Sequence, residues 1–341
     1  MDSFFYVNLG NSQIPVLVEG NVQSNKFIVI IHGGPGGSGF DYMNNGAFER
    51  LEEDFAVVYY DQRLSGGATF SNSDHSATIP TRKEMATDLD QLTRVIKAKY
   101  GENMQLYLLG HSWGGELLCE YMSTQAYAGR IDGMISVAGL TVYNDSFQTL
   151  GENRRELILS ICDTEIDEGN KDEIWTQIKN QILSHDSISG PKWHLGTHWQ
   201  EGWDVSWNYI YEAGKAADRR FNNHLYHDNR VHIDGSRYES EPGQSNRGVF
   251  ISENTATYLY PLLVEGRSDQ SEDIKRIDAP CLIITGKYDC VVPPKTGAKL
   301  FNDISTPVKD KFYFEIDSTS HAPYRREAEF YALVRSFISQ Y

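Results

Sequence analysis

The sequence has little cysteine, no strongly basic block and no long apolar run. The four cysteines form no C-x-x-C pair, which favours free thiols in a reducing compartment over a disulfide framework or a zinc site; they are Cys119, Cys162, Cys281 and Cys290. The formal net charge is −16 and Lys and Arg do not cluster, so neither nucleic acid nor an anionic membrane surface is an expected partner. No apolar run approaches the roughly 20 residues of a membrane span. The first residues lack the basic start and apolar stretch of a signal peptide, so a cytoplasmic protein is expected.

The sequence does contain a regular alternation of short apolar segments and amphipathic ones. The apolar segments predict strands at 4–9, 14–20, 26–32, 55–60, 104–110, 133–139, 279–286 and 311–317, the first two as an antiparallel pair. Thr81 and Glu84 form a capping box ahead of an apolar stripe at helical spacing. Further helices are expected at 113–127, from about 294 and from about 324 to the end. This order predicts an α/β fold with a mostly parallel sheet and helices on both faces.

A long stretch in the middle of the chain interrupts this alternation. Residues 141–275 are polar, acidic in places and rich in aromatic side chains, and five of the six tryptophans lie between Trp175 and Trp207. Such side chains could form a small core of their own or line an apolar pocket. We therefore predict a core made of residues 1–140 and 276–341, with a large helical cap, residues 141–275, inserted after the sixth strand.

The segment "YLLGHSWGGELL" carries a G-x-S-x-G motif centred on Ser112. The motif falls between a predicted strand and a predicted helix, which is the context that a nucleophile elbow requires. There the glycines allow a tight turn, and the serine hydroxyl lies at the helix N-terminus. A glycine-containing turn with an incidental serine is the alternative interpretation, and the flanking strand and helix favour the nucleophile.

A serine nucleophile needs a base, and the base needs an acid to orient it. Asp289 follows the predicted strand 279–286 and His321 follows the last strand, so the order is Ser, Asp, His, and all three lie at carboxyl ends of parallel strands. Taken singly, Asp289 could cap a turn and His321 could be a surface histidine. Asp317 is a second candidate for the acid, although it precedes His321 by only four residues.

The glycine-rich segment "HGGPGG" after the strand 26–32 fits an oxyanion hole. A tetrahedral acyl intermediate needs two N–H donors, one of them from the residue after the serine, which is Trp113. We predict Gly34 as the other donor, with Gly33 as the second choice and as a candidate contact with the substrate. A phosphate-binding loop is the alternative, but the segment lacks G-x-x-x-x-G-K-[ST] and opens no obvious helix.

These motifs together resemble the proline iminopeptidase group of α/β hydrolases. The resemblance rests on "HGGPGG", "YYDQRLSGG", "GHSWGGELL" and the late Asp and His, and it covers about residues 26–139 and 279–341. It implies an α/β-hydrolase core with a helical cap, and serine-dependent removal of N-terminal residues, often proline, from short peptides. It implies no metal and no organic cofactor.

The sequence departs from that group at several positions. The family's "DQRGSG" has Leu64 in place of glycine here, so this loop is expected to follow a different path, and "GGSWGG" has His111 in place of a glycine. Family aminopeptidases bind the substrate amine with acidic cap residues, and the resemblance of "WNYIYEAG" nominates Glu212 for this role. Some members place another acid directly after the catalytic Asp, where this chain has Cys290.

Other candidate sites are weaker. The cap histidines resemble metal ligands only loosely and are expected to be surface or capping residues; they are His194 and His198 with Glu201 nearby, and His224, His227 and His232. Arg63 could bind a substrate carboxylate, but a structural ion pair with loop backbone is the preferred interpretation.

The sequence therefore predicts a serine hydrolase that acts on a small molecule or a short peptide, as a monomer or small homo-oligomer. An aminopeptidase leads, with an esterase, lactonase or amidase as the alternative because a triad does not select its leaving group. Epoxide or haloalkane hydrolysis would need a carboxylate nucleophile in place of Ser112. A ligand receptor on a hydrolase fold would be expected if the triad were broken.

Overall fold

The structure is a computed structural model that describes residues 3–43, 45–70, 80–141, 146–168, 269–317 and 319–341, together with residues 175, 176, 179, 180 and 183. The described residues form a 9-stranded sheet. Its strands are β1 (Ser3–Asn8), β2 (Ser12–Gly20), β3 (Lys26–Ile31), β4 (Ala56–Tyr60), β5 (Thr69–Phe70), β6 (Gln105–His111), β7 (Gly133–Val137), β8 (Cys281–Gly286) and β9 (Lys311–Ile316).

The sheet is mostly parallel, as the sequence predicts. Its order is β1-β2-β4-β3-β6-β7-β8-β9, and β5 pairs with β2. Strand β2 pairs antiparallel with β1, β4 and β5, and every pair from β4 across to β9 is parallel. All eight predicted strands are confirmed to within a few residues. The two-residue strand β5 was not predicted, because so short a segment carries no periodicity.

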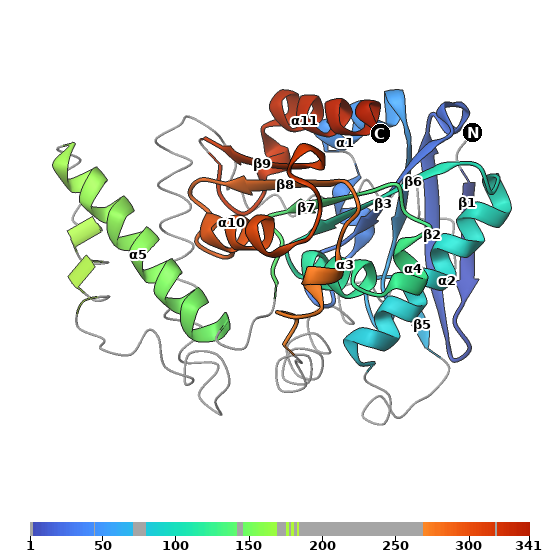
Figure 1. The fold of residues 1–341 in the computed structure, drawn as a ribbon, viewed down its shortest axis with the longest axis horizontal. Coiled ribbons are helices and arrows are strands. Elements are labelled where there is room, and N and C mark those ends of the chain that lie inside the picture. The colour runs from blue at the N-terminus through green and yellow to red at the C-terminus, as the bar shows by residue number, and fades with distance from the viewer. Residues whose placement is uncertain are drawn as a thin grey trace.

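Helices cover both faces of the sheet (Figure 1). They are α1 (Gly46–Asp54), α2 (Arg82–Tyr100), α3 (Trp113–Met122), α4 (Gln125–Ala128), α5 (Ser146–Asp167), α10 (Pro294–Asp303) and α11 (Glu327–Gln340). In β3, Phe27, Val29 and Ile31 belong to the core cluster that also contains residues of α2 and α3. The alternate residues Ile28 and Ile30 pack with α1 and α11 on the other face. The strand is buried on both sides, which explains its continuous apolar sequence.

Two helix predictions meet different outcomes. Helix α2 begins at the predicted capping box, in which Thr81 and Glu84 satisfy each other's backbone N–H groups. The helix predicted over 113–127 is instead two helices, α3 and α4. The hydroxyls of Ser123 and Thr124 donate to the carbonyls of Cys119 and Glu120, so these side chains compete for the carbonyls of the preceding turn where the helix ends.

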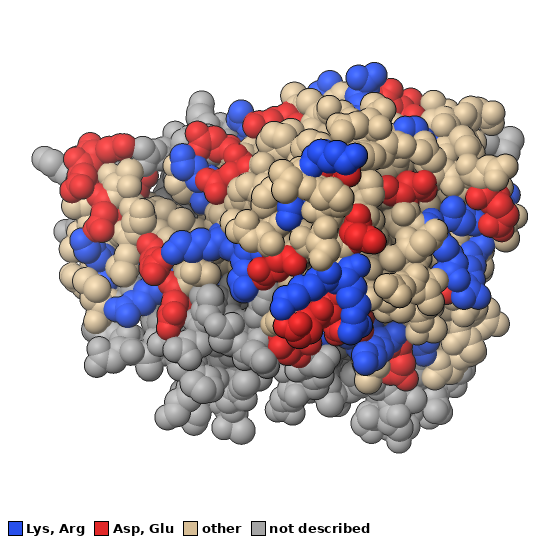
Figure 2. All heavy atoms as spheres, in the orientation of Figure 1, with Lys and Arg blue, Asp and Glu red and all other residues tan. Residues whose placement is uncertain are grey.

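The predicted insertion falls between two neighbouring strands, because β7 and β8 pair in parallel. Helix α5, which lies within residues 141–275, extends away from the carboxyl ends of the strands (Figure 1). The boundaries at 140/141 and 275/276 stay predictions, since most of the stretch lies outside the described residues. No helix of the described residues is both long and apolar enough to cross a membrane. On the face in Figure 2, basic and acidic side chains are interspersed over the core.

Candidate active site

Ser112 lies on a sharp turn between β6 and α3. Its backbone has φ +55° and ψ −121°, a region that non-glycine residues rarely occupy. Hydrogen bonds hold the strained turn on both sides: the Ser112 N–H donates to the Val137 carbonyl at 3.1 Å, and the Ser112 carbonyl accepts from the N–H of Leu140 at 2.9 Å. The half-buried hydroxyl therefore stands at the N-terminus of α3, as the nucleophile-elbow prediction requires.

The glycines of the motif are needed because the turn packs against neighbouring backbone. A Cβ added to Gly110 would lie 2.4 Å from the Gly114 carbonyl oxygen. A Cβ added to Gly114 would lie 2.0 Å from the carbonyl oxygen of Ile31 in the adjacent strand. Neither position leaves room for a side chain, so G-x-S-x-G here is a steric requirement of the turn.

The structure brings Ser112, His321 and Asp289 together in one hydrogen-bonded series. His321 Nε2 lies 2.9 Å from Ser112 Oγ, and His321 Nδ1 lies 2.9 Å from Asp289 Oδ2. Asp289 is fully buried, and its other oxygen accepts the N–H groups of Val291 and Val292 at 2.8 and 2.9 Å. Because a carboxylate can only accept, Nδ1 carries the ring proton and Nε2 is the acceptor for the serine hydroxyl.

Asp317, the second candidate for the acid, is not part of this series. Its carboxylate pairs with Lys287 at 2.7 Å and is 72% exposed. The sequence could not separate the two aspartates because each follows a strand near His321. The structure favours Asp289 because, of these two aspartates, it is the one whose carboxylate contacts the imidazole.

The predicted oxyanion loop passes directly over the serine. A Cβ added to Gly33 would lie 3.2 Å from Cβ of Ser112. The Gly33 N–H donates to the Tyr42 hydroxyl at 3.1 Å, so this donor already has an acceptor. Gly34 has φ +135°, which glycine adopts without strain. Gly34 and Trp113 remain the predicted oxyanion donors.

Two residues that the sequence analysis missed tie this loop to the elbow. The Gln62 N–H donates to His32 Nε2 at 3.0 Å, and the Gln62 amide donates to the His32 carbonyl at 3.0 Å. The Gln62 side-chain oxygen accepts the indole N–H of Trp113 at 3.2 Å. Burial lowers the pKa of His32 to about 4, so the imidazole is neutral near pH 7. His32 begins the "HGGPGG" segment and Gln62 lies in "YYDQRLSGG". Membership in these two motifs is the sequence feature that could have identified both residues.

The loop after β4 contains two further candidates. Arg63 pairs with the carboxylate of Asp88 on α2 through two bonds of 2.6 and 2.7 Å, and it also donates to the Asn11 side chain. An ion pair is confirmed, but the predicted partner was wrong, since it is a side chain and not loop backbone. Leu64 has φ +60°, so the residue that replaces a family glycine takes a left-handed conformation while its side chain is buried.

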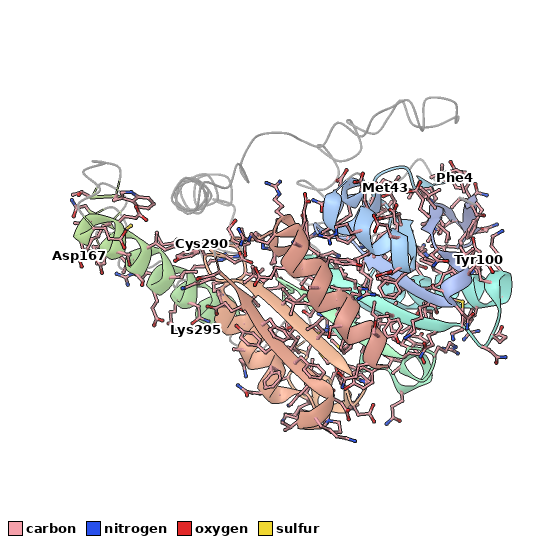
Figure 3. All side chains as sticks on the ribbon, turned by 90° about the horizontal axis from the view of Figure 1, so that it is seen from above. Phe4, Met43, Tyr100, Asp167, Cys290 and Lys295 are labelled. Carbon is pink, nitrogen blue, oxygen red and sulfur yellow. The ribbon has the colours of Figure 1, made fainter. Side chains whose placement is uncertain are left out.

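The residue after Asp289 faces helix α5. Cys290 is buried and packs with Ile158, Ile161 and Cys162 of that helix, where Figure 3 shows α5 meeting the core. This position therefore supplies no acidic group for a substrate amine. Glu212, the predicted amine-binding acid, lies outside the described residues. So do the cap histidines, His194, His198, His224, His227 and His232 with Glu201.

Comparison with known proteins places the chain in a family. The alpha/beta hydrolase fold family matches residues 26–325. "Probable aminopeptidase YbaC" of Bacillus subtilis (strain 168) is 24% identical over 334 residues, which are 96% of this chain and 92% of that protein. A proline iminopeptidase of Saccharolobus solfataricus is 33% identical over 118 residues, which are 35% of this chain and 34% of that protein.

A solved structure gives the same result for the fold. The crystal structure of a proline iminopeptidase from Mycobacterium smegmatis has a TM-score of 0.63 and 19% identity, and the alignment covers 99% of this chain and 98% of that one. The predicted resemblance and the predicted fold class are thereby confirmed. The chain belongs to the alpha/beta hydrolase fold family and is similar to its proline iminopeptidases.

Proposed function

We propose that this hydrolase is a serine aminopeptidase that releases N-terminal proline or other small residues from short peptides. The observation that carries the proposal is the series Ser112–His321–Asp289, with two contacts of 2.9 Å and a buried acid. The proposed nucleophile contacts the proposed base, and the base contacts the orienting carboxylate, each within hydrogen-bonding distance. Covalent acyl transfer by serine needs this order of contacts.

In this mechanism each group has one role. His321 Nε2 takes the Ser112 proton as Oγ bonds to the carbonyl carbon, and the carbonyl electron pair moves onto oxygen, facing the N–H groups of Gly34 and Trp113. His321 then gives the proton to the leaving nitrogen as the C–N bond breaks. A water molecule repeats the sequence on the acyl-enzyme and releases the free residue. Asp289 holds the imidazole in the tautomer that these transfers require.

The aminopeptidase assignment rests on the relatives that carry this name and on the motif resemblance. It requires an acidic group near the substrate amine, and Glu212 is the candidate. The specific observation that favours the second candidate, an esterase, lactonase or amidase with no amine requirement, is that position 290 carries a cysteine packed against α5 and no acidic group.

A panel of chromogenic substrates tests the proposal. It compares proline and alanine anilides with free and blocked amines against short-chain esters. Cleavage restricted to the free-amine anilides is expected, and cleavage of esters alone would reject the aminopeptidase.

Ser112→Ala tests the mechanism separately from the substrate. We expect turnover on the preferred substrate to fall by at least about 10⁴-fold while the thermal midpoint stays near that of the parent protein. Retained turnover would reject serine catalysis altogether.

A further inference from the structure

His111, directly before the nucleophile, makes contacts that the triad does not include. Its Nε2 lies 2.8 Å from the backbone carbonyl oxygen of His321, and its Nδ1 lies 2.7 Å from the Tyr42 hydroxyl. The two imidazole rings are 5.0 Å apart between centroids. His111 and Tyr42 are both nearly inaccessible to solvent, so each of these polar contacts is made away from water.

The chemistry of the partners fixes the direction of every bond in this group. A carbonyl oxygen only accepts, so His111 Nε2 carries the ring proton and donates to His321. Nδ1 is then an acceptor, and the Tyr42 hydroxyl donates to it. The hydroxyl oxygen accepts in turn from the Gly33 N–H at 3.1 Å. Burial lowers the pKa of His111 to about 3, which keeps the imidazole in the neutral form that this arrangement needs.

We propose that Tyr42 and His111 are a pair of positioning residues that hold the oxyanion loop and the loop of the catalytic base in register around Ser112. The bonds run from Gly33 through Tyr42 and His111 to the His321 backbone, so they connect the glycine loop, the elbow and the base. Among the hydrogen bonds of the described residues, none joins either side chain to Ser112 Oγ or to the His321 imidazole. The pair acts on the rate through the placement of the groups that do.

The pair depends on the position at which this chain departs from the "GGSWGG" pattern. A glycine at 111 would have no ring to reach either Tyr42 or His321. The replacement of that glycine by His111 thus adds a link between loops that the glycine pattern lacks. Displacement of a reacting group by about 1 Å can cost about 100-fold in rate, so such a link is expected to be visible in turnover.

The test rests on the proposed serine mechanism and uses Tyr42→Phe, which removes only the hydroxyl. Two readouts are compared with the parent protein: kcat and KM on the best substrate of the panel, and the rate of Ser112 modification by a fluorophosphonate, followed by mass spectrometry. We expect kcat and the modification rate each to fall by about 10-fold or more, with KM changed by less than about 2-fold. His111→Phe should give a similar loss, and the double variant should be little worse than the poorer single one.

Tyr121→Phe is the matched control. Its hydroxyl is also buried, and it contacts Thr93 Oγ1 at 3.2 Å and Asp90 Oδ1 at 3.4 Å, on the side of α3 that faces α2. This variant should lose stability without a change in kcat.

The proposal is overturned if Tyr42→Phe keeps the parent rates, or loses them only in proportion to the unfolded fraction. If Ser112→Ala stays active and still reacts with the probe, the serine mechanism itself fails, and this outcome is distinct from the first. Should His111→Phe not fold, Tyr42→Phe alone decides.

Discussion

The loops that meet at Ser112 are held by two different kinds of contact. On the side of the proposed nucleophile, called here the nucleophile side (residues 32–34 and 110–115), the contacts are close backbone packing and neutral side chains such as His32. On the side of the proposed base and its acid, called here the acid–base side (residues 286–292 and 319–321), a buried carboxylate accepts two backbone N–H groups. A charged side chain of helix α5 adds to this, since Arg154 donates to the Val291 carbonyl, with Nε at 2.9 Å.

This difference indicates how each side responds to change. Close backbone packing against the neighbouring strand leaves little room on the nucleophile side, so steric changes should disturb it most. The acid–base side depends on Arg154, which is 137 residues away from Val291 along the chain. Here a change in α5 should alter activity as well as stability.

The largest expected effect is steric and falls on the nucleophile side. Gly114→Ala places a Cβ 2.0 Å from the Ile31 carbonyl oxygen, where backbone must move to make room. We expect the free energy of unfolding to fall by about 3–5 kcal/mol, measured by urea denaturation. Gly129→Ala is the control, because its nearest neighbour would be 4.0 Å away. Equal stability of the two variants would contradict the steric account of the motif.

An intermediate effect on the free energy of unfolding is expected when the pH is lowered. His32 has a pKa of about 4 in the folded protein and about 6.5 when unfolded, so between these values the unfolded chain binds a proton that the folded one does not. The contribution of His32 to stability is therefore complete above pH 6.5 and falls by roughly 1.4 kcal/mol per pH unit down to pH 4. Urea denaturation at pH 7, 6 and 5 should give a shallower fall for His32→Gln than for the parent protein. If the free energy of unfolding of both proteins changed equally with pH, His32 would bind a proton equally well in the folded and the unfolded state, which contradicts the lowered pKa.

The smallest effects are expected from two substitutions on α5, one at a partly buried contact with the Asp289 loop and one at an exposed ion pair. Arg154→Gln removes the guanidinium bonds to the Val291 carbonyl, so we expect a loss of about 1–2 kcal/mol and a several-fold fall in kcat as the Asp289 loop loosens. Glu156→Gln on the same helix removes only an exposed ion pair with Lys295, and should change stability by less than about 0.5 kcal/mol and kcat not at all. If both variants keep the parent kcat, α5 does not position the acid.

The features that could be predicted from the sequence are those encoded over short distances. The capping box at Thr81 and the G-x-S-x-G motif at Ser112 each involve residues only a few positions apart. Both can therefore be recognised in the sequence without knowledge of the tertiary packing. The alternation of strands and helices likewise follows from local periodicity. The end of α3 was missed because Ser123 and Thr124 compete for backbone carbonyls, a contact that an apolar stripe does not reveal.

By itself, the sequence determined the α/β order, the strand ends that carry Ser112, Asp289 and His321, and the glycines that the elbow needs. Only the tertiary structure decided which contacts those groups make. It placed Asp289 against His321 and Asp317 against Lys287, a choice between two carboxylates near one imidazole. It also gave His111 partners that lie 69 and 210 residues away. Such contacts depend on how β6, the glycine loop and the loop after β9 pack together, and no local pattern specifies that packing.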